Sequence, residues 1–337
     1  MNNQKQLLLS STYIMSTIRH LTSIKDLTDS EFQTLVFKAQ EFKKSFKEGN
    51  PESFAANNKK LLGRTGALLF SKRSTRTRIS NEGALSYFGC KPMFLGKDDI
   101  QLGVNESFYD SIKVISSMTS CIMARVNKNS EIQELVKHSS VPVINCLCDM
   151  YHPLQAICDL LTIVEKYGAD NLKNLTLCWI GDANNVINDL MFACLKFGIS
   201  VKIATPKDIE MDAALVKEAA ELAKKNGCVF ECTHDAKQSA TDSDILVTDT
   251  FISMGEEWQK TAKLKQFEGF QINDEIAALA KPDYTFMHCL PRHTEEVSDS
   301  VFYDEKHSIV FQEAENRLYA AIATLDVFVN NKGDFTK

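Results

Sequence analysis

Cations and hydroxyls are concentrated in one short stretch, SKRSTRTRIS, at residues 71–80. Every charged residue between positions 53 and 81 is basic, although the whole chain has a formal net charge of -6. Guanidinium groups beside hydroxyl donors form the combination that binds an anion such as a phosphate. The residues of the stretch that could take part are Lys72, Arg73, Ser74, Thr75, Arg76, Thr77 and Arg78.

The position of this stretch favours an anion site over an ordinary charged surface. The apolar run TGALLF at 65–70 predicts a strand, and Ser74 is a suitable N-cap for a helix that ends near Gly89. A helix N-terminus contributes only about 0.3–2 kcal/mol toward an anion, so a phosphate also needs the hydroxyls and an arginine. A solvated charge run at a helix start is the alternative interpretation. A P-loop is excluded, because no Gly-Lys-Ser/Thr motif follows a glycine-rich turn.

Three more polar side chains follow at element ends. Arg125 ends the apolar run CIMARV, at the edge of an α/β sheet where ligands usually bind. His152 and Gln155 lie three residues apart on the first turn of a predicted helix at 152–167, so they share one face and could reach a carbonyl or an amide. A surface arginine and a helix-capping histidine are the alternative interpretations.

The second half of the chain places further candidates at strand ends. WIGDANNVIND follows a buried strand, but its single glycine argues against a nicotinamide cofactor, whose fingerprint needs three. Asn184 and Asn185 offer amide groups there instead. The segments VTDTFISMG and MHCLPRH also end strands, and adjacent strand ends can bring a carboxylate and a thiol together. Their candidates are Asp249, Ser253, Met254, His288, Cys289 and Leu290.

Cys289 could act as a nucleophile if it had a partner base. A metal site with His288 is disfavoured, because neighbours on a strand point to opposite faces. Cys228 and Cys232 lack a second ligand pair with zinc-finger spacing, so we expect core cysteines rather than a zinc site. Most of the other cysteines lie in apolar runs, which suits reduced thiols.

Composition excludes several classes of protein. The chain has 337 residues, 44% of them hydrophobic and 24% charged, and no apolar run reaches the eighteen residues of a membrane span. A pI near 5.7 argues against nucleic acid as a partner. Residues 1–20 carry Lys5, Arg19 and no acid, which weakly resembles a mitochondrial transit peptide, and Met15 is a possible second start. We therefore expect a cytoplasmic protein, with the mitochondrial matrix as the alternative.

β-rich runs alternate with amphipathic helical stretches, which predicts an α/β fold of two doubly wound domains with mainly parallel sheets and an active site in the cleft between them. Expected strands are 65–70, 92–95, 121–126 and 141–145 in the first half, and 175–181, 200–205, 228–233, 244–249 and 284–290 in the second. We expect a first domain at 1–151, an interdomain helix at 152–167, a second domain at 168–312, and a C-terminal helix at 313–337 that joins the first domain.

Taken together, these motifs resemble the aspartate/ornithine carbamoyltransferase family from about Arg19 to the C-terminal helix. STRTR and HPLQ are shared across that family, whereas DTFISMGEE and HCLPRH are similar to its ornithine branch. The resemblance implies transfer of a carbamoyl group from carbamoyl phosphate to the δ-amine of ornithine, without cofactor or metal, in a homotrimer. Aspartate, putrescine or acetylated ornithine as acceptor, and a catalytically silent binding protein, are the alternatives.

The resemblance also implies roles for individual residues. Ser74, Thr75, Arg76, Thr77 and Arg125 would hold the phosphate, while His152, Gln155, Cys289, Leu290 and Arg317 of ENRLY would address the carbamoyl group. Asn185, Asp249, Ser253 and Met254 would bind ornithine, and Gln101 would reach a neighbouring subunit's site. Catalytic roles would fall to Arg125, His152, Asp249, Cys289 and Arg317. Ala183 departs from the family pattern, since many relatives have glycine there.

Overall fold

A computed structural model describes residues 18–49, 51–97, 100, 106–252 and 260–337. Three of the expected site residues, Gln101, Ser253 and Met254, lie outside this described part. None of the helices in these ranges combines the length and apolar character needed to cross a membrane.

The first half of the chain builds a four-stranded parallel sheet in the order β2-β1-β3-β4. All four strands were predicted from the sequence. In the register of the sheet, Phe70 at the end of β1 lies beside Arg125 at the end of β3, so both strands deliver their chains to one edge. The strands are β1 (Thr65–Phe70), β2 (Lys91–Gly96), β3 (Ile122–Arg125) and β4 (Val143–Leu147).

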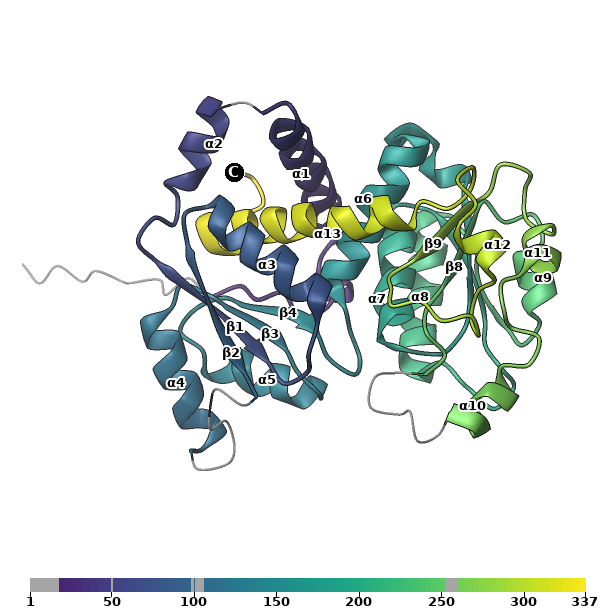
Figure 1. Ribbon diagram of the computed structural model, residues 1–337, viewed down its shortest axis with the longest axis horizontal. Coiled ribbons are helices and arrows are strands. Elements are labelled where there is room, and N and C mark those ends of the chain that lie inside the picture. Colours follow the sequence, from purple (N-terminus) through teal and green to yellow (C-terminus); the bar gives the residue numbers. More distant parts are fainter. Residues whose placement is uncertain (1–17, 50, 98–99, 101–105, 253–259) are drawn as a thin grey trace, which may run out of the picture.

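Helices pack on both faces of this sheet (Figure 1). The N-terminal segment also adds to it, since Leu21 bridges to Ile144 of β4. The helices are α1 (Asp29–Lys47), α2 (Pro51–Asn58), α3 (Thr75–Tyr87), α4 (Phe108–Met118) and α5 (Asn129–His138).

The second half builds a five-stranded parallel sheet in the order β7-β6-β5-β8-β9. The chain runs from β5 outward through β6 to β7 and then crosses back to β8 on the other side of β5, which creates the switch point at which α/β sheets bind ligands. Its strands are β5 (Thr176–Ile180), β6 (Ser200–Ala204), β7 (Phe230–Thr233), β8 (Ile245–Thr248) and β9 (Thr285–His288). Its helices are α7 (Asn185–Lys196), α8 (Ala213–Asn226), α9 (Ala236–Ala240), α10 (Lys260–Gln266), α11 (Asp274–Ala277) and α12 (Asp299–Phe302).

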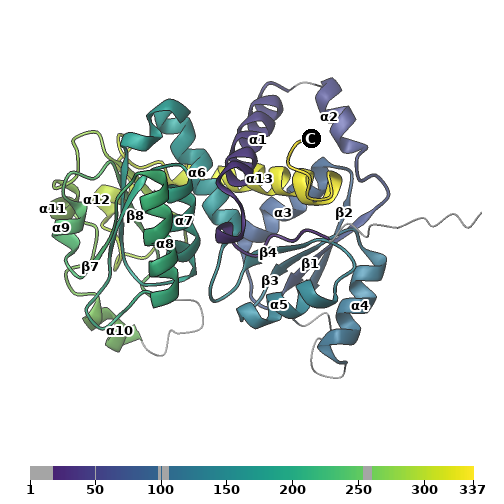
Figure 2. The same ribbon diagram turned by 180° about the vertical axis from the view of Figure 1, so that it is seen from behind.

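Two buried helices join the two halves (Figures 1 and 2). Helix α6 (Pro153–Tyr167) begins with Pro153, whose missing N–H costs nothing at a helix start, and Gly168 follows its end. Helix α13 (Val310–Leu325) returns from the second sheet and packs against α1, α3 and α6.

One cysteine differs from expectation. Cys228 is partly buried, but Cys232 is exposed, because its position on the edge strand β7 leaves that face uncovered by a helix. The prediction of a core cysteine at 232 was therefore wrong. Seven of the remaining cysteines are fully buried in the described part of the chain, as their apolar contexts indicated.

Gly89 closes the turn after α3, which is the helix that begins at the cationic stretch. Its φ is +73°, and an added Cβ would lie 2.0 Å from the carbonyl oxygen of Asn58. Replacing Gly89 by alanine is expected to lower the free energy of unfolding by about 2–4 kcal/mol, from backbone strain and overpacking together. Urea denaturation measures this loss.

Gly227 provides the matched control, because its φ is +70° but no atom lies within 4 Å of an added Cβ. Gly227→Ala is expected to cost only about 1 kcal/mol, the strain component alone. Equal losses in the two variants would contradict the steric explanation.

Candidate functional site

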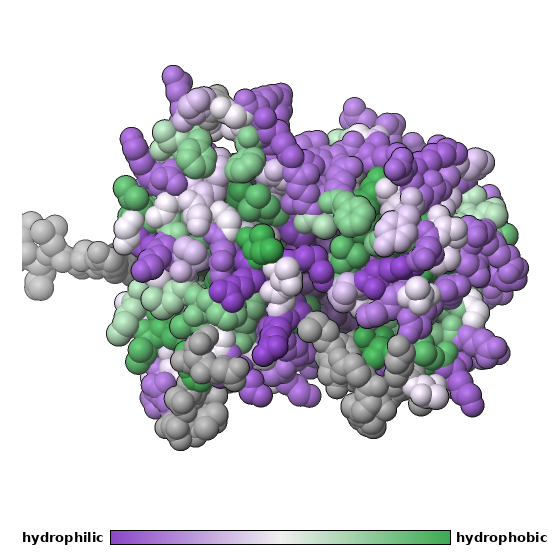
Figure 3. Space-filling model, viewed as in Figure 1, coloured by the Kyte–Doolittle hydropathy of each residue, from purple (hydrophilic) through white to green (hydrophobic). Residues whose placement is uncertain are grey.

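A cavity of about 530 Å³ lies between the two halves of the molecule. The space-filling view shows that the two lobes meet in a furrow with hydrophilic side chains along it (Figure 3). The candidates Arg78 and His288 do not line this cavity, but every residue of the described part to which the family resemblance assigns a role does. These are Ser74, Thr75, Arg76, Thr77, Arg125, His152, Gln155, Asn185, Asp249, Cys289, Leu290 and Arg317.

The cationic stretch forms the N-terminus of α3, as its position after β1 predicted. Ser74 has an extended backbone and caps the helix, since its hydroxyl accepts a hydrogen bond of 3.2 Å from the N–H of Thr77. The N–H groups of Thr75 and Arg76 lack intrahelical partners, because they belong to the first turn. The helix therefore presents free donors to the cavity.

Three arginine side chains converge on this helix start. Arg125 and Arg317 are buried, and both donate to the hydroxyl of Thr77, over 3.5 Å and 3.2 Å. Arg76 donates to the carbonyl oxygen of Leu290, which follows β9 of the other half. These side chains come from α3, β3 and α13, so only the folded chain brings them together.

The arginines are poorly neutralised in this arrangement. Burial, together with the nearby charge of Arg317, lowers the pKa of Arg125 to about 10. Burial also lowers the pKa of Arg76. Among the described residues, the Nε atoms of Arg125 and Arg317 are buried without a hydrogen-bond partner. A bound dianion would supply both the missing charge and the missing acceptors.

His152 lies in the same cluster as the N-cap of α6. Its Nε2 lies 3.1 Å from Nη1 of Arg317, and since a guanidinium only donates, Nε2 is the acceptor and the ring proton lies on Nδ1. Burial and the charge of Arg317 lower the pKa of His152 well below its usual range. Its buried Nδ1 has no partner in the described part of the chain. The neutral ring can therefore donate one hydrogen bond to a ligand.

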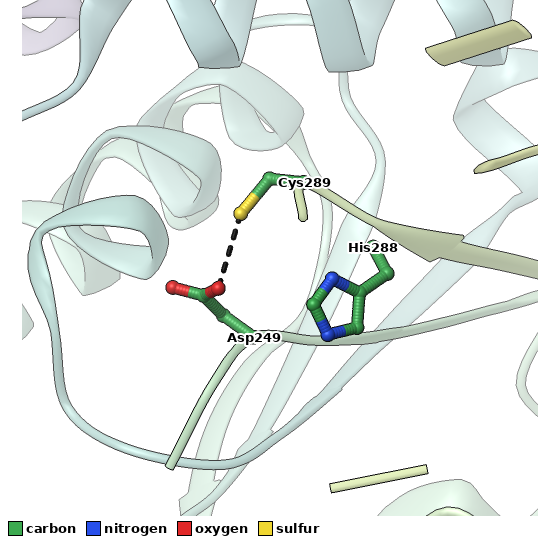
Figure 4. A group of neighbouring side chains, drawn as sticks. All are labelled: Asp249, His288 and Cys289. Atoms are coloured by element: carbon green, nitrogen blue, oxygen red, sulfur yellow. Dashed lines mark hydrogen bonds between the residues drawn. The ribbon is translucent and has the colours of Figure 1, made fainter. Parts of the chain in front are cut away.

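Opposite the arginines, Asp249 and Cys289 face each other from the ends of β8 and β9 (Figure 4). The thiol of Cys289 donates to Oδ1 of Asp249 over 3.2 Å, and Asn184 donates to Oδ2 over 2.9 Å. Burial, reinforced by the charge of Asp249, raises the pKa of the Cys289 thiol well above its usual range. Cys289 is therefore a protonated donor here, rather than a thiolate able to accept a proton.

The geometric argument against a metal at Cys289 was wrong. The donor atoms of Asp249, His288 and Cys289 lie within 4.8 Å of one another; β9 ends at His288, so Cys289 follows the strand and lies outside the segment in which side chains alternate. Both ring nitrogens of His288 already have protein partners, since Nδ1 accepts from the N–H of Leu290 over 2.9 Å and Nε2 lies 3.3 Å from Glu296. The imidazole would have to release one of them to bind an ion.

The structure gives the candidate Asn184 a specific role. Asn184 orients Asp249 while its side-chain oxygen caps α7 by accepting from the N–H groups of Val186 and Ile187. One further residue joins the site that the motifs did not indicate. Asp189 accepts the backbone N–H of His152 over 2.8 Å, and no local pattern indicated this contact across 37 positions.

Comparison with known proteins covers nearly the whole chain. Residues 19–165 match the family described as aspartate/ornithine carbamoyltransferase, carbamoyl-P binding domain. Residues 173–328 match the Asp/Orn binding domain of the same family.

Individual relatives agree with this match. The chain is 64% identical over 328 residues to ornithine carbamoyltransferase of Saccharomyces cerevisiae, covering 95% of this chain and 96% of the relative. It is 52% identical to mitochondrial ornithine carbamoyltransferase of Emericella nidulans, with coverages of 94% and 90%. A crystal structure of the mitochondrial enzyme from Coccidioides immitis superposes with a TM-score of 0.87 at 49% identity, covering 95% of this chain and all of that one.

Proposed function

The chain belongs to the aspartate/ornithine carbamoyltransferase family, and we propose that it catalyses transfer of the carbamoyl group of carbamoyl phosphate to L-ornithine, giving L-citrulline and phosphate for arginine biosynthesis. One observation carries the proposal: an under-neutralised cluster of Arg76, Arg125 and Arg317 faces the carboxylate of Asp249 across a single cavity. A cavity with these two sides suits an anionic donor and an amine acceptor.

Carbamoyl phosphate would bind with its phosphate at the N-terminus of α3. The N–H groups and hydroxyls of Ser74, Thr75 and Thr77 surround that position, and Arg76 and Arg125 complete it. The carbamoyl group would then point toward the start of α6 and the end of β9. It would contact the carbonyl group of Leu290 there, and the side chains of His152, Gln155, Cys289 and Arg317.

Ornithine would occupy the other side of the cavity. Asp249 would receive its δ-amine, and Asn185 its amino-acid head group. In the described structure the amide of Asn185 donates to the carbonyl oxygen of Cys148 over 2.7 Å, so this contact must adjust when the substrate enters. The family resemblance adds Ser253 and Met254, which lie outside the described residues.

The acceptor amine has to lose a proton before it attacks. A lysine-like amine with a pKa near 10.4 is protonated at neutral pH, and removing the proton costs about 4–5 kcal/mol. Because Cys289 is held as a neutral thiol that donates to Asp249, the carboxylate is the better acceptor of that proton. The amine would then attack the carbamoyl carbon, and the Nδ1–H of His152 with Arg125 and Arg317 would stabilise the charge that develops on the carbonyl oxygen. Phosphate leaves on the arginine side.

The proposed division of labour follows the two sheets. Residues 1–151 with the returning segment 313–337 would bind carbamoyl phosphate, residues 168–312 would bind ornithine, and residues 152–167 would connect the two domains. The substrates dock on opposite sides of the cavity, so closure of the domains would bring them into contact.

We also propose a homotrimer in which Gln101 reaches a neighbouring subunit's site. Exposed apolar side chains of the described residues are concentrated on the first domain, which supports an interface there. They include Phe54, Leu62, Ile79, Met93, Tyr109, Val114 and Met118. Light scattering on the purified protein is expected to give three times the mass of the 37.8 kDa chain.

The compartment forms a separate part of the proposal. The relatives from Emericella nidulans and Schizosaccharomyces pombe are named mitochondrial, whereas the name of the Saccharomyces cerevisiae relative has no such word. Residues 1–20 contain a single arginine, a weak transit signal, and we propose the cytoplasm, with the mitochondrial matrix as the alternative. The compartment is tested by attaching residues 1–20 to the N-terminus of a fluorescent protein and locating the fluorescence in the cell. Diffuse fluorescence is expected, and mitochondrial fluorescence would establish the alternative.

The activity itself is tested by incubating the purified protein with carbamoyl phosphate and a panel of acceptors. Citrulline formation is expected with ornithine, including in the presence of a chelator. A greater rate with putrescine, N-acetylornithine or aspartate would assign the other acceptor. Absence of any ureido product from folded protein that still binds ornithine would indicate a silent binding protein.

Cys289→Ser is expected to change the pH dependence of kcat while leaving the Kd for carbamoyl phosphate within about threefold, a difference of less than 1 kcal/mol. The raised pKa of Cys289 keeps the thiol neutral at pH 7 and moves its ionisation to alkaline pH, where a thiolate beside Asp249 would oppose amine deprotonation. Serine does not ionise, so the alkaline limb of the profile should move. An unchanged profile, or a trapped carbamoyl thioester in the native enzyme, would contradict this role.

A further inference from the structure

Two carboxylates, those of Asp159 and Glu313, lie against each other beneath the arginine cluster. Both are 2% exposed, Asp159 on α6 and Glu313 on α13. Their side chains hydrogen bond to each other. The amide nitrogen of Gln155 donates to Asp159 over 2.7 Å and lies 3.1 Å from Glu313. Neither acid lines the cavity, and no step of the proposed reaction uses them.

A hydrogen bond between two carboxyl groups requires a proton on one of them. Two adjacent buried carboxylates cannot both ionise without a large cost, so the pair holds one proton and one negative charge. Burial, the main cause, raises the pKa of both groups, that of Asp159 to about 7. The other titratable or charged groups that act on the pair are Arg76, Cys158, Cys194, Asp249, Cys289 and Arg317.

This pair determines the orientation of the Gln155 amide. Because the NH₂ group of Gln155 donates to the acids, its oxygen must point the other way, toward Nη1 of Arg317, which donates to it. Nη1 also contacts His152, and Nη2 contacts Thr77 at the start of α3. The acids hold the NH₂ group of Gln155 and so turn its oxygen toward Arg317. The direction of the Arg317 guanidinium in the anion site therefore depends on them.

The same pair reaches the opposite side of the cavity. The second oxygen of Glu313 accepts the backbone N–H of His288 over 2.9 Å, at the residue directly before Cys289. Glu313 thus contacts the strand end that carries the thiol, while Gln155 holds the arginine. Both sides of the cavity are fixed through one buried hydrogen-bonded unit.

We propose that Asp159 and Glu313 are positioning residues that share one proton and, through Gln155, hold Arg317 in the orientation that receives carbamoyl phosphate. The proposal rests on the proposed carbamoyl transfer for its kinetic readout, and a crystallographic readout separates the two. In a purely structural role, the two buried acids would stabilise the fold without controlling the orientation of Arg317.

Amide and apolar substitutions at the same position distinguish the two roles. Asparagine at 159 can accept from Gln155 and donate to Glu313, as a protonated aspartic acid does, whereas leucine of similar size can do neither. Asp159→Asn is therefore expected to keep kcat/KM for carbamoyl phosphate within about threefold, since it retains the Glu313 carboxylate and the hydrogen bonds of the pair. Asp159→Leu is expected to lower it about 100-fold, the usual effect of displacing a positioned group by 1 Å.

Glu165→Gln is the matched control. Glu165 lies on the same helix, faces the same helix α13, and accepts from Lys43, Gln312 and Asn316, without a contact to Gln155 or Arg317 among the described residues. It is expected to lower the thermal midpoint without changing kcat/KM. A loss of activity in this control similar to that in Asp159→Leu would overturn the proposal.

Three further outcomes decide the matter. A folded Asp159→Leu enzyme with native kcat/KM, or a 100-fold loss in Asp159→Asn, would contradict the proposal; if the leucine variant does not fold, Asp159→Asn alone carries the test. A crystal structure of Asp159→Asn is expected to keep Arg317 on the oxygen of Gln155, and a rotated Gln155 would contradict the proposal. This readout needs no turnover, so a native protein that forms no citrulline would refute only the proposed function.

Discussion

Replacing Arg76 by alanine is expected to weaken carbamoyl phosphate binding by about 100-fold to 1,000-fold. The change removes a guanidinium that can make two charge-assisted hydrogen bonds to phosphate, worth together roughly 3–4 kcal/mol. The remaining arginines, Arg125 and Arg317, are occupied in part by Thr77 and compensate little. Calorimetric titration with carbamoyl phosphate at fixed ionic strength measures the loss.

Arg78→Ala is the control for this experiment. Arg78 follows two residues later on α3, but its Nε pairs with Glu82 over 2.8 Å and its guanidinium lies over the ring of Phe94, away from the cavity. Its substitution is expected to change the Kd less than threefold, since a half-exposed ion pair contributes at most about 1 kcal/mol. Native affinity in Arg76→Ala, or an equal loss in Arg78→Ala, would show that the phosphate does not bind at the helix start.

Asp249→Asn is expected to lower kcat by about 10²-fold to 10⁴-fold, the range for loss of a general base. The single oxygen of asparagine can still accept from one of the two donors, Asn184 or Cys289, but the side chain can neither take a proton nor attract the ammonium form of ornithine. The Kd for carbamoyl phosphate should stay close to the native value, because the phosphate lies on the opposite side of the cavity. Single-turnover measurement of citrulline separates the chemical step from binding.

Asp244→Asn provides the comparison on the same strand. Asp244 precedes β8 at its amino end and binds the backbone N–H of Thr176 and the ammonium of Lys281, far along the strand from the cavity. It is expected to reduce stability with kcat preserved. A native kcat in Asp249→Asn would remove Asp249 from the chemistry, and an equal loss in both variants would indicate a structural effect.

Local sequence signals predicted the parts of the site that one element builds. Ser74 after an apolar run was enough to predict the cap of α3, and Pro153 with Gly168 was enough to bound α6. Strand-end positions predicted that Asp249 and Cys289 lie at one edge of the second sheet and that Arg125 lies at the corresponding edge of the first, because parallel strands deliver their carboxyl ends to one side. These features depend on backbone conformation within a few residues.

Contacts between distant residues could not be predicted in the same way. Arg76 meets Leu290 across 214 positions, where the two halves of the molecule approach each other. Gln155 meets Glu313 across 158 positions, and the packing of α13 against α6 creates this contact. The relation of His288 to Cys289 was missed for a different reason: the alternation rule holds within a strand, and β9 ends at His288. Cys232 was missed because an edge strand has an open face that composition does not reveal.

The protonation state of Cys289 also required the folded structure. From the sequence, Cys289 was a candidate nucleophile that needed a partner base, but burial beside Asp249 raises the pKa of the thiol and makes it a donor. Burial and the sign of the nearest charge decide this, and neither follows from the motif HCLPRH.

The most direct measurement is a crystal structure with an unreactive phosphonate that links analogues of both substrates. The phosphonate oxygens are expected to accept from the N–H groups at the start of α3, with Arg76, Arg125 and Arg317 around them. The amino-acid end is expected to lie between Asn185 and Asp249. Density for the compound elsewhere, with this cavity empty, would contradict the central claim that the two sides of the cavity hold the two reactants.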